Sequence, residues 1–371
     1  MSALFTPYAI GPLALRNRIA IAPMCQYSAE DGNATDWHMI HLGGLALSGA
    51  ALLTLEATAV EAIGRITADD LGLYNDENQA ALVPVLAAIR KHSHIKVAIQ
   101  LAHAGRKASS QVPWAGGAQV PPDGPRGWDT VGPSALPHNP AEVPPLALDH
   151  AGLARVKAAF VRAAERSHAL GIDAIELHFA HGYLMHQFLS PISNRREDAY
   201  GGALENRMRF PLEVFDAVRA AVLASMPVGV RISASDWVDG AWDVEQSVVL
   251  GRALAERGCA FMHVSSGGVS PQQKIPLEPN YQVPFARRMK QECGMPTFAV
   301  GLITEAAQAE EIIASGQADV VALARAVLFD PRWPWHAAAA LGAAVEAPPQ
   351  YWRSQPRELK HLFGEITLGS R

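Results

Sequence analysis

Residues 175–210 read IELHFAHGYLMHQFLSPISNRREDAYGGALENRMRF, and they place polar side chains where an apolar stretch ends. Residues 173–177 have the character of a buried strand. His178, His181 and Tyr183 follow within six residues, and each can donate a hydrogen bond to an oxygen. Because α/β folds place their chemistry at the carboxyl ends of strands, this stretch predicts a functional site.

Strand-like runs of this kind recur along the chain and alternate with longer segments of helical period. The candidate strands are residues 19–22, 52–56, 96–101, 174–177, 228–232, 261–264, 297–300 and 320–323. The helical segments are residues 36–47, 78–91, 153–170, 206–224, 244–257, 283–292, 304–314 and 333–341. Repeated βα units in this order predict an α/β fold, a closed (β/α)8 TIM barrel rather than an open sheet. We expect Asp243 and Thr304 to cap their helices.

Two segments fall outside this repeating pattern. Residues 109–146 are rich in Pro and Gly and keep no hydrophobic period, which predicts a long loop between the third strand and its helix. An interdomain linker is the other interpretation, but the barrel pattern lies on both sides, so we expect a single domain over residues 1–371. Residues 347–371 form a C-terminal tail in which Tyr351, Trp352 and Arg353 lie outside any barrel element.

The composition is that of an ordinary globular protein. Hydrophobic residues make up 49% and charged residues 18% of the 371, which is enough for a large core. A net charge of −5 gives no broad basic field for nucleic acid or an anionic membrane, and no apolar run is long enough to cross a bilayer. We therefore expect small-molecule partners. The three cysteines are far apart and no signal-peptide pattern opens the sequence, which favours a cytoplasmic location.

Residues able to bind a ligand recur at the ends of the other predicted strands. They are, in chain order, residues 23–27, 56–58, 100–103, Arg231, residues 265–268, Gly301, Ala324 and Arg325. Gly301 and Arg325 follow the seventh and eighth strands, where barrels commonly bind phosphate through backbone N–H groups and a guanidinium group. A phosphate-bearing cofactor or substrate is therefore expected, although a single arginine here can also be a surface residue.

Taken together, these motifs resemble the old yellow enzyme flavoproteins, and within them the thermophilic-like branch of bacterial xenobiotic and enoate reductases. The resemblance runs from LFTPYAIGPLALRNRIAIAPMCQYSAEDG through QLAHAGRKAS and ELHFAHGYLMHQFLSPISNRREDAYGG to VALARAVLFDPRWPW. It implies a (β/α)8 barrel that binds FMN non-covalently, is reduced by NADPH or NADH and is reoxidised by an activated alkene. It also implies a homodimer or homotetramer in which the C-terminal tail reaches the neighbouring active site.

The resemblance further implies a cofactor site. Its residues are Ala22, Pro23, Met24, Cys25 and Ala57 along the isoalloxazine ring, Gln100 at the pyrimidine edge, Arg231 near N1 and O2, and Gly301, Ala324 and Arg325 at the phosphate. The fixed charge of Arg231 would stabilise the reduced flavin. Two positions depart from common family patterns, since Cys25 stands where other branches have Thr, and Ala324 where Gly is frequent.

For the substrate, the resemblance assigns His178 and His181 to the carbonyl oxygen and Tyr183 to protonation of the α-carbon. Tyr27 and, from a neighbouring subunit, Arg353 would also contact the substrate. Many relatives have His followed by Asn where this chain has two histidines. Both pairs donate to an oxygen, so the expected reaction is the same.

Other interpretations stay open on the residues alone. The two histidines can be hydrogen-bonded core residues or, with Glu176, metal ligands. Cys25 can be a small buried hydrophobic residue, Tyr27 and Tyr183 can pack at a loop, and Arg353 can be a solvated tail charge. The alternative functions are a barrel lyase, which needs a metal triad or a lysine at a strand end, and a non-catalytic flavin- or phosphate-binding protein, which needs no proton donor.

Overall fold

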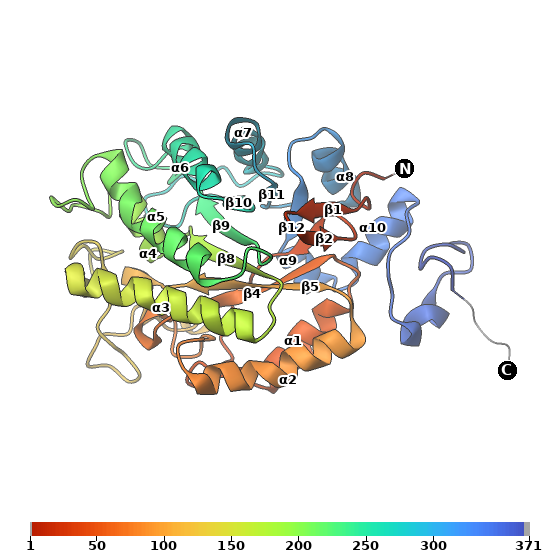
Figure 1. Ribbon diagram of the computed structural model, residues 1–371, viewed down its shortest axis with the longest axis horizontal. Helices are drawn as coiled ribbons and strands as arrows, with labels where there is room; N and C mark the ends of the chain where they lie inside the picture. The colour runs from red at the N-terminus through yellow and green to blue at the C-terminus, as the bar shows by residue number, and fades with distance from the viewer. Residues whose placement is uncertain (1, 367–371) are drawn as a thin grey trace.

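In the computed structural model, which describes residues 2–366, eight parallel strands close into the barrel that the sequence predicts (Figure 1). They are β3 (Ile19–Ile21), β4 (Leu52–Ala59), β5 (Lys96–Ala102), β8 (Ala174–Phe179), β9 (Val228–Ser233), β10 (Met262–Ser265), β11 (Thr297–Ala299) and β12 (Val320–Leu323). Each pairs with the next in chain order, and β12 closes the barrel on β3 with Ala322 in register with Ala20. The strand predictions are confirmed to within about three residues at their ends.

The helices that surround the barrel also match the predicted segments. They are α1 (Asp36–Ala46), α2 (Asp76–His92), α3 (His150–Ala169), α5 (Leu204–Ala221), α6 (Val244–Glu256), α7 (Val283–Cys293), α8 (Ala306–Ala314) and α10 (Trp333–Leu341). Short helices α4 (Leu184–Leu189) and α9 (Arg325–Phe329) directly follow the turns after β8 and β12 and were not predicted. No helix within residues 2–366 is long and apolar enough to cross a membrane.

One of the two predicted helix caps is correct. The Asp243 side chain accepts a hydrogen bond from the backbone N–H of Gln246 and caps α6. The prediction for Thr304 was wrong, because α8 begins at Ala306 with Glu305 at its N-cap. The side chain of Gln308 accepts hydrogen bonds from the N–H groups of Thr304 (2.9 Å) and Glu305 (3.3 Å), which holds both residues outside the helix.

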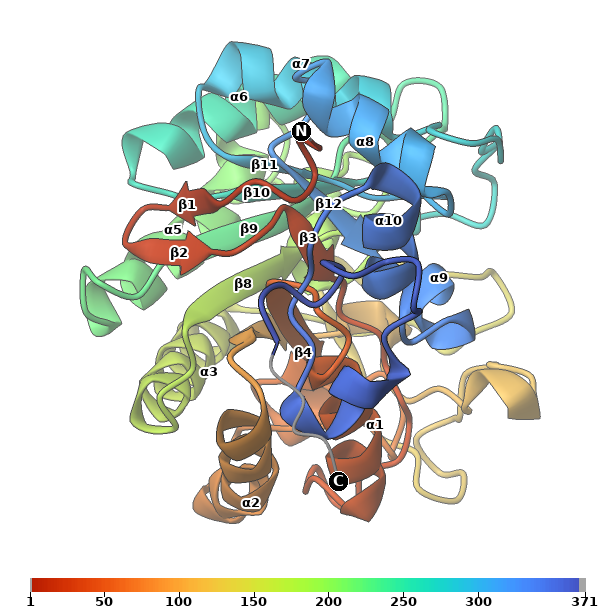
Figure 2. The same ribbon diagram turned by 90° about the vertical axis from the view of Figure 1, so that its right-hand side faces the viewer.

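An apolar hairpin covers the amino end of the barrel. Strands β1 (Tyr8–Ile10) and β2 (Leu13–Leu15) pair antiparallel around a turn in which Gly11 has a φ of 56°, and the sequence analysis did not predict them. Their apolar side chains join a core cluster with the stacked rings of Phe261 and Phe298, whose centroids are 4.9 Å apart. In Figure 1 and Figure 2 this hairpin and the chain that follows α10 lie at the same end of the barrel.

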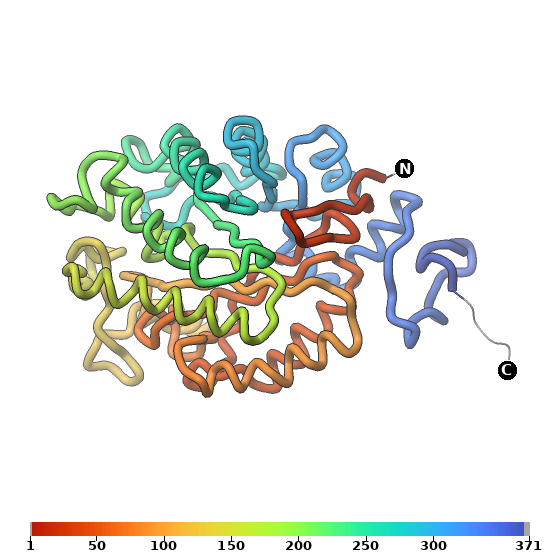
Figure 3. The backbone as a smooth tube through the Cα atoms, in the orientation of Figure 1, coloured from red at the N-terminus to blue at the C-terminus, as the bar shows by residue number. Residues whose placement is uncertain are grey.

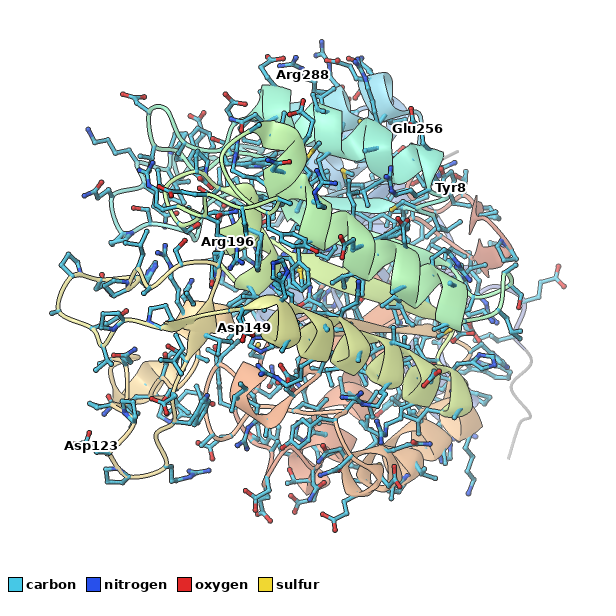
Figure 4. All side chains as sticks on the ribbon, turned by 60° about the vertical axis from the view of Figure 1, so that its left-hand side comes forward. Tyr8, Asp123, Asp149, Arg196, Glu256 and Arg288 are labelled. Atoms are coloured by element: carbon cyan, nitrogen blue, oxygen red, sulfur yellow. The ribbon has the colours of Figure 1, made fainter. Side chains whose placement is uncertain are left out.

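The carboxyl end of the barrel carries the long loop instead. Residues 103–149 connect β5 to α3 and include a short parallel pair, β6 (Val131–Gly132) and β7 (Leu146–Ala147). The backbone trace in Figure 3 shows this loop at the left, opposite the C-terminal segment. Figure 4 places Asp123 at its outer edge. The strand ends predicted to carry chemistry therefore lie beneath this loop, away from the hairpin and the tail.

Candidate active site

The turn after β8 brings the three predicted polar residues together. His178 is buried at the end of the strand, His181 follows in a left-handed turn with a φ of 58°, and Tyr183 is the N-cap of α4. The ring of His178 lies 5.1 Å from that of His181 and 5.0 Å from that of Tyr183, measured between centroids. The side chains predicted to act on one substrate are thus close neighbours.

Lys107 holds this turn against the loop that follows β10. Its ammonium group donates hydrogen bonds to the carbonyl oxygens of His181 (2.8 Å) and Gly268 (3.0 Å), and it lies 5.1 Å from the Tyr183 ring centroid. A Cβ atom at Gly182 would lie 2.1 Å from the Gly268 oxygen, so only glycine fits there. Burial, and then the charge of neighbouring Arg106, lower the pKa of Lys107 to about 8. Lys107 lies within the QLAHAGRKAS motif, but no pattern in the sequence predicts its contacts with residues 181 and 268.

A buried polar network supports the turn from below. His186 Nδ1 accepts a hydrogen bond from the N–H of Gly182 (2.9 Å), and its Nε2 lies 2.8 Å from a carboxylate oxygen of Asp236. The other Asp236 oxygen accepts from the Ser190 hydroxyl (2.6 Å), and Gln187 donates to the Gly182 carbonyl (2.7 Å). These supporting residues were not predicted from the sequence. His186 and Gln187 are in the quoted motif, but nothing in the sequence shows what they contact.

The protonation states follow from burial. Burial, followed by the charge of Arg231, lowers the pKa values of His178 and His181 well below 6.5, so both imidazoles are neutral near pH 7. Burial also raises the pKa of Tyr183 well above 10, so its hydroxyl keeps its proton. His181 Nε2 lies 2.7 Å from the Ser265 hydroxyl, while the buried Nδ1 of His178 has no hydrogen-bond partner within residues 2–366. The site therefore contains neutral donors.

Arg231 is the permanent cation of the site. It lies on β9, buried, in register with His178 on β8 and His263 on β10. Its Nε has no hydrogen-bond partner within residues 2–366. A buried guanidinium group without a partner is costly, so this position suits a ligand that presents acceptor oxygens or nitrogens.

The residues predicted for the flavin edge lie on the neighbouring strands. Ala57 on β4 is in register with Gln100 on β5, which is in register with Glu176 on β8. All three are buried, and the Gln100 amide donates to the Glu176 carboxylate at 2.7 Å. Glu176 is thus engaged within the barrel, and no group of three or more His, Cys, Asp or Glu residues able to hold a metal is present in residues 2–366.

The segment after β3 lines the opposite side of the site. It contains the predicted residues Ala22, which is buried, and Pro23, Met24 and Cys25, which are half-buried. Burial raises the pKa of Cys25 well above 9, so this residue is a thiol. Tyr27 follows in a left-handed conformation with a φ of 51°, and its ring packs edge-on against Trp114 of the long loop at 5.6 Å.

The predicted phosphate residues share one pocket with Arg231. Gly301, Ala324 and Arg325 line a cavity of about 190 Å³ that also reaches Arg231. Gly301 has a φ of 111°, and a Cβ atom there would lie 2.3 Å from the Gln282 amide, so glycine is required. Arg325 is exposed at the rim. The orphaned Arg231 nitrogen, the glycine turn and this cavity fit the FMN that the resemblance implies.

Arg353 is the predicted residue that the structure does not bring to this site. It is exposed on η4 (Pro349–Ser354), which packs through Tyr351 against Trp335 of α10 at 5.9 Å. This segment lies at the hairpin end of the barrel, as Figure 2 shows. Arg353 therefore does not contact the active site of its own chain.

Known proteins share both the sequence and the fold. Residues 3–343 match the NADH:flavin oxidoreductase / NADH oxidase family. The chain is 44% identical to an NADPH dehydrogenase of Geobacillus sp. (strain WCH70), with 94% of this chain and 98% of that protein covered.

Solved structures give the same result. Morphinone reductase superposes with a TM-score of 0.77 at 29% identity, covering 94% of this chain and 92% of the reductase. A 2-naphthoyl-CoA reductase complex gives a TM-score of 0.81 at 22% identity and covers 92% of this chain. This chain spans only 52% of that protein, so the similarity shows a shared fold and nothing about the reaction. The chain therefore belongs to the NADH:flavin oxidoreductase / NADH oxidase family, that of the old yellow enzymes, and is an oxidoreductase with FMN as its cofactor.

Proposed function

We propose that this protein is an ene-reductase, which uses NADPH or NADH to reduce the C=C bond of α,β-unsaturated carbonyl compounds and other activated alkenes. The observation that carries the proposal is the pair of neutral histidines beside a protonated tyrosine, next to a buried cation. The names of its relatives support a nicotinamide reductant, since they are called NADPH dehydrogenases and one structure of morphinone reductase contains tetrahydroNAD.

The cofactor would occupy the pocket that starts at Arg231. Gly301, Ala324 and Arg325 would hold the phosphate, and Gln100 would face the pyrimidine edge of the ring. Residues 22–25 and Ala57 would line the ring itself. The chemistry that bound FMN supplies is two-electron transfer from NAD(P)H to the β-carbon of the alkene.

The protein's own groups would act on the substrate oxygen and the α-carbon. His178 and His181 would donate hydrogen bonds to the carbonyl oxygen, whose negative charge grows during the reaction. Their lowered pKa values keep both imidazoles neutral, and the N–H group of a neutral imidazole is too weak an acid to transfer its proton to that oxygen. Tyr183, whose pKa is raised, would supply the proton to the α-carbon, and Tyr27 would contact the substrate from the other side.

The assembly and location are part of the same proposal. The protein would act in the cytoplasm as a homodimer or homotetramer of the thermophilic-like branch. The exposed position of Arg353, outside its own site, is compatible with a contact to the site of a neighbouring subunit. If each subunit places its Arg353 at the site of the other, the two identical subunits must meet at a symmetric interface.

Spectroscopy and rapid kinetics test the proposed reaction. The purified protein should be yellow, heat should release FMN rather than FAD, and added FMN should raise the melting temperature of the apoprotein. In anaerobic stopped-flow experiments NADPH should bleach the flavin, and 2-cyclohexenone should restore its colour. A protein that NADPH bleaches but that no activated alkene reoxidises would contradict the ene-reductase proposal while leaving the family assignment intact.

A further inference from the structure

Glu176 is a buried charge that the proposed reaction does not use. It lies on β8, two residues before His178, and only 1% of it is exposed. One carboxylate oxygen accepts from the Gln100 amide at 2.7 Å, and the other lies 2.9 Å from Nδ1 of His263. Burial opposes ionisation, but the interactions with His263, Arg231 and Gln100 outweigh it and lower the pKa of Glu176. Glu176 is therefore an anion inside the barrel.

This anion determines the orientation of Gln100. An ionised carboxylate can only accept hydrogen bonds, so it must face the NH₂ group of the amide and not its carbonyl oxygen. The Gln100 oxygen is then the atom left for a ligand, and its partner must be a donor. The pyrimidine edge of a flavin carries one N–H group, at N3, which is the donor that this orientation selects.

The same anion acts on Arg231. Glu176 is in register with Gly229 on β9, so Arg231 lies two residues further along that strand with its side chain on the same face. His263, which contacts Glu176, is in register with Arg231 on the other side. Burial lowers the pKa of Arg231, and Glu176 is the foremost of the nearby groups that oppose this shift. The carboxylate lies next to an apolar layer, since the ring of its partner His263 is 5.9 Å from that of Phe298. In such surroundings charges are screened weakly, so Glu176 reduces the positive potential that Arg231 creates nearby.

We propose that Glu176 is a positioning residue of the flavin site: it turns the Gln100 oxygen toward the flavin N3–H group, and its charge offsets Arg231 and so lowers the reduction potential of bound FMN. The inference rests on the proposed placement of FMN at Gln100 and Arg231. It separates two roles of one side chain, an orienting role that acts through Gln100 and an electrostatic role that does not need Gln100.

Five variants and two measurements separate these roles. FMN dissociation constants come from fluorescence titration of the apoprotein, and midpoint potentials from anaerobic reduction with a reference dye. Glu176→Gln should weaken FMN binding about tenfold, the equivalent of about 1.4 kcal/mol. It should also favour reduced over oxidised FMN about tenfold, a rise of about 30 mV for a two-electron couple. In a Gln100→Leu background the same change should leave affinity unaltered and still raise the potential.

Glu176→Asp keeps the charge but shortens its reach, so it should weaken FMN binding and leave the potential near that of the wild type. If Glu176→Gln does not fold, Glu176→Asp still tests both the orienting and the electrostatic role. Glu61→Gln is the matched control, because Glu61 also pairs with a histidine, His103 at 3.2 Å, and with Arg155, but contacts neither Gln100 nor Arg231. Glu61→Gln should change neither the FMN dissociation constant nor the midpoint potential.

An unchanged potential in Glu176→Gln, or a changed one in Glu176→Asp, would overturn the electrostatic role. An affinity loss that persists undiminished without Gln100 would overturn the orienting role. If the wild-type protein binds no FMN at all, the cofactor assignment itself fails, which is a different result from either of these.

Discussion

The two ends of this barrel differ in how an arginine is bonded: Arg18 at the amino end is half-buried, and Arg231 at the carboxyl end is buried. At the amino end, Arg18 donates to the Thr6 hydroxyl (3.0 Å) and to the Asp319 carbonyl (3.2 Å), and it lies 4.5 Å from the centroid of the Tyr8 ring. At the carboxyl end, the Nε of buried Arg231 has no partner within residues 2–366. The polar atoms of Arg18 are thus paired within the chain, while the Nε of Arg231 is left for a ligand.

This difference shows that the contacts that stabilise the barrel and the residues of the candidate site lie at opposite ends of the molecule. The apolar hairpin closes the amino end and buries side chains such as Ile10 and Leu15. At the other end, left-handed turns at Tyr27 and His181 and unpaired polar atoms are kept in place by contacts such as those of Lys107. Such features cost folding free energy and persist where a site needs them.

The largest expected effect is that of Arg231→Met. Removing the cation should weaken FMN binding about 10³-fold, because a buried charged contact is worth several kcal/mol. The apoprotein should nevertheless melt at nearly the same temperature, since an unpaired buried charge is lost while Glu176 keeps its contacts with Gln100 and His263. FMN titration and calorimetry of the apoprotein measure the two effects.

Arg18→Met is the matched variant at the opposite end. It breaks satisfied hydrogen bonds, so it should lower stability by about 1–3 kcal/mol and leave FMN affinity unchanged. The contrast between the two ends would be refuted if both variants destabilised the apoprotein equally and neither affected the flavin.

The next effect concerns His178→Ala. Loss of one donor to the substrate oxygen should slow reoxidation by 2-cyclohexenone about 10²-fold and affect reduction by NADPH much less. Stopped-flow measurement of each half-reaction separates the two. His181→Ala should behave similarly, whereas Tyr183→Phe should slow reoxidation only about tenfold, because solvent can supply the α-proton. Equal slowing of both half-reactions would instead point to a general disturbance of the flavin site.

The buried histidines should also make stability depend on pH. Their pKa values in the folded protein lie well below 6.5, so below that pH the unfolded chain binds more protons than the folded one. Stability is then fully present above pH 6.5 and is lost as the pH falls, by up to about 1.4 kcal/mol per pH unit for each histidine. Urea unfolding of the apoprotein between pH 5 and 7 should show a shallower dependence in His178→Ala. An identical dependence would mean that His178 already binds a proton in the folded state.

The smallest expected effect is that of Arg353→Ala in the tail. This variant tests whether Arg353 contacts the active site of a neighbouring subunit. Loss of an exposed charged contact of about 1 kcal/mol should raise the KM for 2-cyclohexenone about fivefold and leave FMN binding unchanged. Arg357→Ala, also exposed in the tail, should change nothing. The mass of the wild-type protein in solution should be that of a dimer or tetramer. A monomer with full activity would show that the tail serves no second site.

The sequence determined the elements and most of the predicted site. Alternation of strand and helix patterns is local, so it predicted the barrel strands and the helices to within a few residues. The same periodicity predicted which residues lie at strand ends, including His178, Arg231 and Gly301, because every carboxyl end of a parallel barrel meets at one face. The N-terminal hairpin escaped prediction, since β1 and β2 precede the first strand–helix unit and so fall outside the repeating pattern.

Only the tertiary structure decided which of these residues act together. Lys107 and His181 are 74 residues apart, and Glu176 and His263 are 87 apart. Their hydrogen bonds exist because closure of the barrel brings separate strand ends to one place, which no local pattern encodes. The unpaired nitrogen of Arg231 is likewise a property of the whole cavity, since burial and the lack of a partner depend on every strand around it.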